Sequence, residues 1–274
     1  MPEGPETRRM ADSISTALID KKIIRFSFFH EQLDSLKALS KISVFDALSK
    51  GKAIIIRING GLSIITHNQL YGKWTFNRPD TQMKTNRQLR IEFVTEKKAV
   101  RLWSATNIVL CNTKDEHLHS YINKIGPDVL DDATDQTVIR KRLIEKKFRN
   151  RILSSTLLDQ SFIAGIGNYL RSEILFFSRL NHLKKPSDLD EAQLNNLSKE
   201  IKNVSLRAYL QKGKTMDYDS IGKLFGNTDN FKRLRHMVFG RVGQPCFICG
   251  DTVIKQFSSS RRVYLCKTCQ EFSV

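Results

Sequence analysis

Four of the five cysteines form two close pairs near the end of the sequence. Cys246 and Cys249 are followed, after sixteen intervening residues, by Cys266 and Cys269. Two thiolates that are two residues apart can point at one metal ion from a tight turn, and a second such pair completes a tetrahedron. A site filled by four sulfur ligands has no open position for a substrate. The spacing therefore predicts one structural zinc ion.

Two other interpretations of these cysteines stay open, namely disulfides and a redox pair. No apolar run reaches the roughly 18 residues of a membrane span, and no secretory signal pattern is visible at the N-terminus. We therefore expect an intracellular protein that is not secreted, and such a setting disfavours disulfides. Cys111 lies among apolar residues and is predicted to be an ordinary buried thiol.

The N-terminus offers a second reactive group. Removal of Met1 would expose the secondary amine of Pro2. An α-amino group titrates at about 7.7 to 8, so a useful fraction is neutral near pH 7. A neutral amine can attack an electrophilic carbon and form an iminium, while the neighbouring Glu3 can transfer protons. Taken alone, the same residues also fit a processed terminus followed by a solvated charge.

An arginine pair lies between the two cysteine pairs. The segment Gln256–Tyr264 has a hairpin-like pattern and carries Arg261 and Arg262. Such a tip could present a guanidinium to a phosphate in bidentate fashion. A solvated basic turn is the alternative for these two residues.

The composition points to a polyanionic partner. The chain has 274 residues with 45 Lys and Arg against 28 Asp and Glu, a formal charge of +17. An excess of this size favours association with nucleic acid, although a solvated basic surface has the same composition. The segment Arg140–Arg151 has seven basic residues interleaved with apolar ones, which indicates a folded element and not a basic tail.

The first part of the chain is predicted to hold one helix and several strands. Pro5–Leu18 has apolar residues at helical spacing. Four β-branched or alternating runs predict strands, namely Lys52–Ile58, Leu62–Thr66, Arg87–Phe93 and Ala99–Trp103. A short helix followed by strands favours a β-sandwich or barrel.

The later part of the chain is predicted to be helical. Gly126, Pro127 and Asp128 interrupt the pattern, and four segments then carry apolar residues at intervals of three and four. These segments are Val138–Phe148, Asp159–Ile163, Tyr169–Phe177 and Asp190–Leu210, and Lys212–Gly226 is predicted to be a loop. The chain from Phe239 onward reads as short strands bearing the cysteines.

With these features in place, the sequence resembles a known family. The opening MPEGPE is similar to the start of the formamidopyrimidine-DNA glycosylase and endonuclease VIII family of base-excision repair enzymes. Further family motifs follow in family order along nearly the whole chain, namely Lys50–Ala53, His67–Gly72, Ile125–Leu130, Phe148–Arg151, Leu157–Leu170 and the cysteine module.

The resemblance implies an α+β, multidomain fold. It implies an N-terminal β-sandwich over residues 1–125, a helical domain with a helix–two-turns–helix motif over 126–238, and a zinc finger over 239–274. The order of strands, helices and cysteines in the pattern agrees with this arrangement.

The resemblance also implies a catalytic set. Pro2 corresponds to the nucleophile that attacks C1′ of the damaged nucleotide, and Glu3 corresponds to the general acid/base. Lys52 corresponds to the lysine of β-elimination, since its place between Gly51 and Ala53 favours it over Lys50.

Arg261 corresponds to the finger arginine that contacts phosphate and assists δ-elimination. Arg262 follows it where the family often has proline, which leaves the assignment ambiguous by one residue.

Five further residues correspond to DNA contacts. Gln69, Leu70 and Tyr71 match residues that endonuclease VIII inserts into the duplex to fill the space of a flipped base. Asn168 matches a ligand of the DNA backbone, and Lys124 stands where the relatives carry arginine. Ordinary packing is the alternative for Leu70 and Tyr71.

The implied activity is that of a bifunctional DNA glycosylase and abasic-site lyase acting as a monomer on damaged double-stranded DNA near the nucleoid. The motifs MPEGPE and HNQLYG match the endonuclease VIII branch, which implies oxidised pyrimidines as substrates. Two alternatives are kept, an oxidised-purine glycosylase and a non-enzymatic zinc protein that binds damaged DNA.

Overall fold

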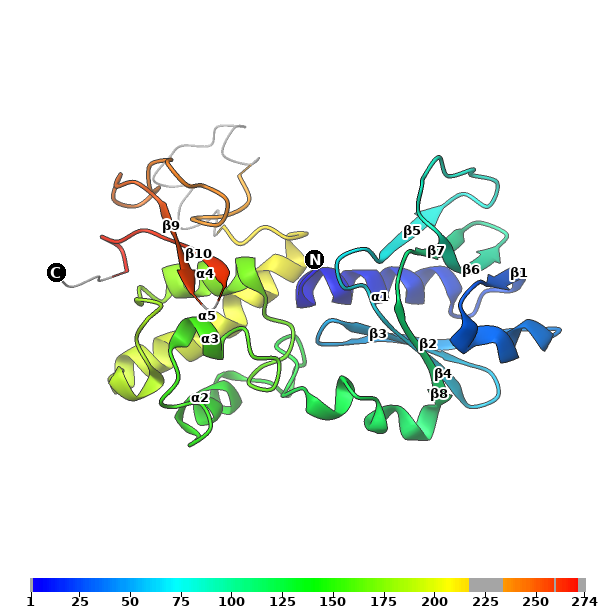
Figure 1. Cartoon of the computed structure of the whole chain (residues 1–274), viewed down its shortest axis with the longest axis horizontal. Helices are drawn as coiled ribbons and strands as arrows, with labels where there is room; N and C mark the ends of the chain where they lie inside the picture. Colours follow the sequence, from blue (N-terminus) through cyan, green and yellow to red (C-terminus); the bar gives the residue numbers. More distant parts are fainter. Residues whose placement is uncertain (1, 217–233, 259, 271–274) are drawn as a thin grey trace. The chain divides into compact units, whose positions relative to one another are not determined.

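The computed structural model describes residues 2–216, 234–258 and 260–270, which form two compact units (Figure 1). One unit holds Pro2 and Glu6–Lys124, and the other holds Glu3–Pro5 and the chain from Ile125 onward. The predicted further division between a helical domain and a zinc-finger domain after residue 238 stays a prediction.

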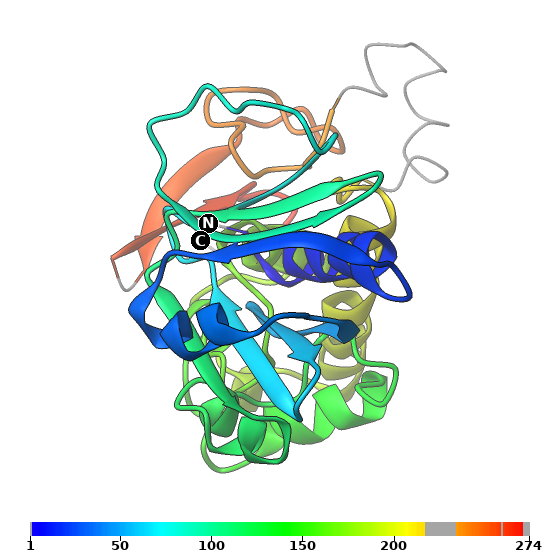
Figure 2. The same cartoon turned by 90° about the vertical axis from the view of Figure 1, so that its right-hand side faces the viewer.

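The first unit contains two antiparallel four-stranded sheets and one long helix (Figure 2). One sheet has the order β1-β6-β7-β5 and the other β2-β3-β4-β8. The strands are β1 (Ile23–Phe28), β2 (Val44–Lys50), β3 (Ala53–Ile58), β4 (Leu62–His67), β5 (Lys73–Asn77), β6 (Leu89–Thr95), β7 (Ala99–Trp103) and β8 (Asn107–Asn112). The predicted β-sandwich is confirmed.

Both faces of β3 and β4 are covered, which explains their continuous apolar runs. Ile54 and Ile56 join a core formed by both sheets and by α1 (Gly4–Leu18), which contributes Ala11, Ile14 and Leu18. Ile55 faces the other way and packs with Tyr121, close to the short 3-10 helix η3 (Ile122–Lys124). Strand segments buried on both sides carry no polar alternation, which accounts for the apolar runs at residues 53–56 and 64–65.

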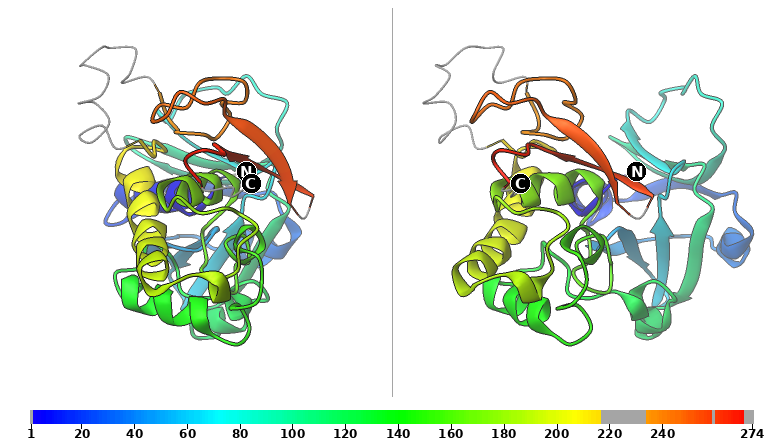
Figure 3. Two further views of the ribbon diagram at one scale, coloured as in Figure 1. Left: turned by 90° about the vertical axis from the view of Figure 1, so that its left-hand side faces the viewer. Right: turned by 60° about the vertical axis from the view of Figure 1, so that its left-hand side comes forward.

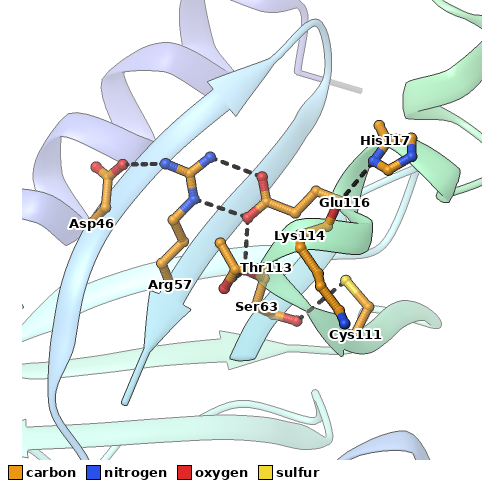
Figure 4. A network of polar contacts seen from close by, with 8 residues as sticks. All are labelled: Asp46, Arg57, Ser63, Cys111, Thr113, Lys114, Glu116 and His117. Carbon is orange, nitrogen blue, oxygen red and sulfur yellow. Dashed lines mark hydrogen bonds and ion pairs between the residues drawn. The ribbon is translucent and has the colours of Figure 1, made fainter. Parts of the chain in front are cut away.

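A polar network attaches the segment after β8 to the outer face of this sheet (Figure 4). Glu116, in the 3-10 helix η2 (Thr113–Leu118), accepts two hydrogen bonds from the Arg57 guanidinium at 2.9 and 2.8 Å and one from the Ser63 hydroxyl at 2.6 Å. Arg57 also donates to Asp46 at 2.9 Å. The hydrogen bonds from Arg57 hold the pKa of Glu116 below its usual value. This bidentate pair fixes the path of the chain toward residues 119–124.

The second unit is mainly helical. Its elements are α2 (Gln136–Ile144), α3 (Leu153–Thr156), α4 (Asn168–Phe177), the 3-10 helix η4 (Pro186–Asp188), α5 (Glu191–Leu210), β9 (Ile254–Ser258) and β10 (Arg261–Leu265). A capping box of Asp190 and Gln193 starts α5. The hairpin of β9 and β10 lies beside α4 (Figure 3), and Val263 and Leu265 join the helical core. None of the helices in the described ranges is long and apolar enough to cross a lipid bilayer.

Two helix predictions were wrong in detail. Asp159–Ile163 forms turns, because the Asp159 carboxylate accepts the Ser161 N–H at 2.8 Å and competes with a helix. Helix α2 ends at Ile144 instead of continuing to Phe148. The chain turns there, and Phe148 is fully buried against Phe162 with 5.2 Å between ring centroids. Of the predicted loop Lys212–Gly226, residues 217–226 lie outside the described residues.

A buried carboxylate organises the chain that leads to the cysteines. Glu173, on α4, is fully buried and accepts the backbone N–H groups of Met237, Val238 and Phe239 at 2.8 to 2.9 Å. It also accepts the Thr215 hydroxyl at 2.6 Å. A buried carboxylate with this many donors is stable, whereas the donors alone would be left unsatisfied.

Replacing Glu173 should therefore be costly. We expect Glu173→Ala to lower the free energy of unfolding by about 3 kcal/mol or more, because three buried N–H groups lose their acceptor. Urea unfolding would measure the change. The exposed Glu191→Ala serves as the control and should change stability by less than about 1 kcal/mol. Equal effects of the two substitutions would contradict this role of Glu173.

Candidate active site and nucleic-acid interface

Glu3 is fixed at the N-terminus of α4. Its carboxylate is 5% exposed and accepts the backbone N–H groups of Gly167 and Tyr169 at 2.8 Å and of Leu170 at 3.2 Å. The first N–H groups of a helix have no partner within it, and the helix dipole favours a negative charge there. The carboxylate is thus held in one orientation at the start of α4.

Gly167 makes room for this arrangement. A Cβ atom at this position would lie 2.3 Å from Cδ of Glu3. A main-chain hydrogen bond also joins the start of the chain to the segment before α4, because the Gly4 N–H donates to the Gly165 carbonyl at 2.8 Å. The Leu157–Leu170 motif therefore needs glycine for a close approach to Glu3.

A buried arginine connects Asn168 to the cysteine-bearing hairpin. Arg171, one turn into α4, is fully buried and donates to Oδ1 of Asn168 at 2.8 Å and to the carbonyl of Arg262 at 2.7 Å. Burial, together with the charge of Arg261, lowers the pKa of Arg171 to about 10, so it stays charged at pH 7. Because Oδ1 of Asn168 is occupied, the NH₂ group of that amide is the end left to contact a ligand.

Arg261 and Arg262 open β10, and both side chains are exposed. The register pairs Arg261 with Ser258 and Arg262 with Phe257. The hairpin is also attached to α3, because the hydroxyls of Ser154 and Ser258 are 2.7 Å apart. Of the two arginines, Arg261 is the one whose charge contributes, after burial, to the lowered pKa of Arg171.

The four paired cysteines come together as predicted. The sulfur atoms of Cys246, Cys249, Cys266 and Cys269 all lie within 4.8 Å of one another. The Sγ atoms of Cys246 and Cys269 are 3.8 Å apart, and those of Cys249 and Cys266 are 3.4 Å apart. A tetrahedral ion with bonds of about 2.3 Å to sulfur places its ligands at about 3.8 Å from each other. The cluster can hold one metal ion.

Pro2 lies at a cavity within the first unit. The cavity measures about 370 Å³ and is lined by Pro2, Glu6, Arg9, Met10, Ser13, Asn68, Gly72, Lys73 and Trp74. One wall is thus a face of α1 and another is the connection between β4 and β5. Pro2 therefore borders an open space beside α1 and the β4–β5 connection.

The three residues predicted to enter DNA are displayed on a tight turn between β4 and β5. Leu70 and Tyr71 are 71% and 70% exposed, which excludes ordinary core packing. The Gly72 N–H donates to the Asn68 carbonyl at 2.7 Å, and a Cβ atom on Gly72 would lie 2.7 Å from that oxygen. Gln69 takes a left-handed conformation with φ of 46°. Its N–H is accepted by Nδ1 of His67 at 3.1 Å.

Lys52 lies in the turn between β2 and β3 and is 8% exposed. Its backbone N–H donates to the Tyr121 hydroxyl at 2.9 Å. Burial and the nearby charge of Lys52 lower the pKa of His67, so this imidazole is neutral at pH 7. The turn that carries Lys52 lies beside this histidine, because Ala53, the next residue, pairs with His67 in the sheet.

The predicted residues fall into two groups. The second unit gathers Glu3, Asn168 and Arg261 around the start of α4, and the first unit holds Pro2, Lys52 and the turn of Gln69–Tyr71. Lys124 ends η3 as an exposed residue of the first unit.

Sequence reasoning missed the supporting residues Arg171, Glu173 and Tyr121. A charged residue inside the apolar run LRSEILFF was the signal available for the first two. The sequence around Tyr121 carries no comparable signal.

Two family models match the sequence. The formamidopyrimidine-DNA glycosylase N-terminal domain matches residues 1–106, and the formamidopyrimidine-DNA glycosylase H2TH domain matches residues 125–220. Among solved structures, a complex of Lactococcus lactis Fpg (MutM) with DNA containing an oxidised pyrimidine has a TM-score of 0.79 and 20% identity, covering 98% of this chain and 100% of that one. A complex of the Lactococcus lactis protein with DNA containing an abasic site has the same TM-score at 19% identity. These structures share the fold.

Curated relatives carry the comparison further. Endonuclease 8 of Salmonella typhi is 37% identical over 272 residues, covering 99% of this chain and 100% of that protein. Endonuclease 8 of an Escherichia coli strain is 36% identical over 271 residues, covering 98% of this chain and 100% of the relative. Identity of this level over the full length establishes the family. The chain belongs to the formamidopyrimidine-DNA glycosylase and endonuclease VIII family, and is a DNA glycosylase and abasic-site lyase that acts on damaged DNA in base-excision repair.

Proposed function

We propose that this enzyme removes oxidised pyrimidines through a Schiff base on Pro2 and then cuts the strand by β,δ-elimination. One observation carries the proposal. Pro2 lines the same cavity as Asn68 and Gly72, the residues that flank the exposed turn of Gln69–Tyr71. The proposed nucleophile and the proposed wedge therefore belong to one site in the first unit. The full-length relatives named Endonuclease 8 support the pyrimidine branch.

The reaction follows from the groups present. The neutral Pro2 nitrogen attacks C1′, the glycosidic bond breaks, and the base leaves with the bonding electrons and takes up a proton. The Pro2 nitrogen then loses its proton, and the C1′–O4′ bond breaks as O4′ is protonated, which opens the sugar and leaves a C=N bond between C1′ and Pro2. The resulting iminium acidifies the neighbouring proton of the opened sugar. Loss of that proton expels the 3′ phosphate, and a second elimination releases the 5′ phosphate. This requires prior removal of Met1.

Glu3 and Lys52 handle the protons in this scheme. The Glu3 carboxylate is fixed by three backbone N–H groups and is thus a preorganised acceptor. Lys52 is buried, so its ammonium acts from a restricted position as proton donor during excision and β-elimination. The alternative interpretation, in which Glu3 and Lys52 are only solvated surface charges, does not fit the burial of these two residues.

The exposed side chains of the β4–β5 turn have a mechanical role. A base must leave the helix stack before Pro2 can reach C1′, at a cost of a few kcal/mol. Leu70 and Tyr71 expose apolar and aromatic surface that can fill the vacated space, and Gln69 lies beside them. The turn displays them because Gly72 closes against Asn68.

Three residues are proposed to contact the DNA backbone. The free amide end of Asn168 and the guanidinium of Arg261 lie near the start of α4, where positive potential favours phosphate. Lys124 is exposed and can contribute one point charge, without the bidentate geometry of arginine. The protein is proposed to act as a monomer.

The metal of the cysteine cluster is proposed to be zinc in a structural role. The sulfur spacing fits a tetrahedral ion with no position left for a substrate. Cys246, Cys249, Cys266 and Cys269 would hold it as thiolates and so fix the base of the hairpin that carries Arg261.

A covalent intermediate provides the direct test. Borohydride should trap the Met1-processed enzyme on abasic duplex DNA, because it reduces the iminium to a stable amine. Protein that retains Met1 should give no trapped species, since its Pro2 nitrogen is in an amide bond. Mass spectrometry verifies the N-terminus of each sample. Strand cutting by protein that retains Met1 would refute the Pro2 mechanism, and so would strand cutting by the Met1-processed enzyme without a trapped species.

A comparison of lesions tests the substrate class. Duplexes with thymine glycol or 8-oxoguanine, otherwise identical, should be cut at different rates, and the thymine glycol duplex should be faster by about tenfold or more under single-turnover conditions, equivalent to about 1.4 kcal/mol. A faster reaction on 8-oxoguanine would establish the oxidised-purine alternative instead.

The neighbouring arginines provide a matched pair of variants. We expect Arg261→Ala to weaken binding of abasic-analogue DNA and to slow elimination about tenfold or more, because a charge-assisted contact to phosphate is lost. Arg262→Ala should have a smaller effect on both measurements. Its main-chain carbonyl, which binds Arg171, is retained in the variant. Equal effects of the two substitutions would contradict the assignment of Arg261.

A further inference from the structure

Tyr121 contacts the turn that carries Lys52. Gly51, with φ of 58°, and Lys52 form the tight turn between β2 and β3. The Lys52 N–H donates to the Tyr121 hydroxyl at 2.9 Å. A backbone donor at a residue that is only 8% exposed needs a protein partner, and this hydroxyl provides one.

The ring of the same tyrosine contacts the support of the wedge. Tyr121 packs edge-on against the His67 ring, with 5.1 Å between centroids and 73° between planes. Nδ1 of His67 in turn accepts the N–H of Gln69 at 3.1 Å, in the strained left-handed residue that begins the turn. One side chain thus touches the backbone of Lys52 and the histidine that holds Gln69.

Tyr121 is itself held in place. Its N–H donates to Nδ1 of His119 at 3.2 Å, and its carbonyl accepts the N–H of Lys124 at 3.1 Å. Upstream, the pair of Glu116 and Arg57 shown in Figure 4 fixes the segment to the sheet. The tyrosine therefore has a fixed base from which to position its neighbours.

We propose that Tyr121 is a positioning residue that holds Lys52 through its hydroxyl and the His67–Gln69 pair through its ring. The proposal rests on the roles given above to Lys52 in proton transfer and to Gln69 in the wedge. In this proposal Tyr121 acts through Lys52, His67 and Gln69 and not on the substrate itself. The roles of the hydroxyl and of the ring can be tested separately, because a Tyr121→Phe substitution keeps the ring and removes only the hydroxyl.

The test is a double-mutant cycle of Tyr121→Phe and Lys52→Gln. Base excision is measured under single-turnover conditions on thymine glycol duplex, and affinity is measured on a duplex with a tetrahydrofuran abasic analogue. Tyr121→Phe should slow excision about fivefold, the loss of one hydrogen bond, and should change affinity less than about twofold. In the Lys52→Gln background the same change should have no further effect, because it acts through Lys52.

Tyr121→Leu removes the ring as well and should also weaken binding of the analogue duplex. Tyr209→Phe, in the core of the second unit, is the matched control and should match wild type. A slowing of equal size in both lysine backgrounds, or none in either, would overturn the proposal. A partial loss of folded protein would act equally in both backgrounds and is thereby recognised. Borohydride trapping by wild type separates these results from a failure of the Pro2 mechanism itself.

Discussion

The carboxylate of Glu3 on the first backbone amides of α4 is the contact on which the proposed catalytic arrangement depends. Its three N–H donors come from a helix end that would otherwise lack partners, so the carboxylate and the helix satisfy each other. Gly167 is required because a Cβ there would overlap with the Glu3 side chain. A residue next to the proposed nucleophile is thereby fixed by a motif more than 160 positions away.

Helix α4 organises the rest of the second unit by the same means. It buries two opposite charges, Arg171 and Glu173, and each satisfies backbone groups of distant segments. Buried charges are costly unless they are hydrogen-bonded, so the bonds that these two side chains make help to define where those segments lie. Arg171 holds the hairpin of Arg261 by its main chain, and Glu173 holds the chain that leads to the first cysteine pair. Buried side chains of α4 therefore help to position the residues that are proposed to contact phosphate.

In the first unit, a tight turn keeps two large apolar side chains exposed to solvent. Leu70 and Tyr71 are exposed because Gly72 and the left-handed Gln69 keep the turn too tight for them to fold back. Exposed apolar residues on a built turn indicate an interaction surface. His67 and Tyr121 stabilise this turn from beneath, and Tyr121 also contacts the turn that carries Lys52.

The features that depend on local spacing could be predicted from the sequence. Each of these features depends on residues that are close together in the sequence, so the local pattern was sufficient to predict it. They are the C-x2-C pairs, the apolar runs of β3 and β4, and the helix that begins after Asp190. The family motifs added the catalytic set, because each motif occupies a recognisable stretch of sequence.

Contacts between segments that are far apart in the sequence could be identified only from the folded structure. Nothing near Arg171 in the sequence reveals that it bonds to Arg262, nor does Tyr121 reveal its bond to Lys52. The turn at Asp159 and the end of α2 were misjudged for the same reason, since an Asp side chain and the burial of Phe148 overrode the helical spacing. Burial and hydrogen-bond partners are properties of the folded chain, and local periodicity does not contain them.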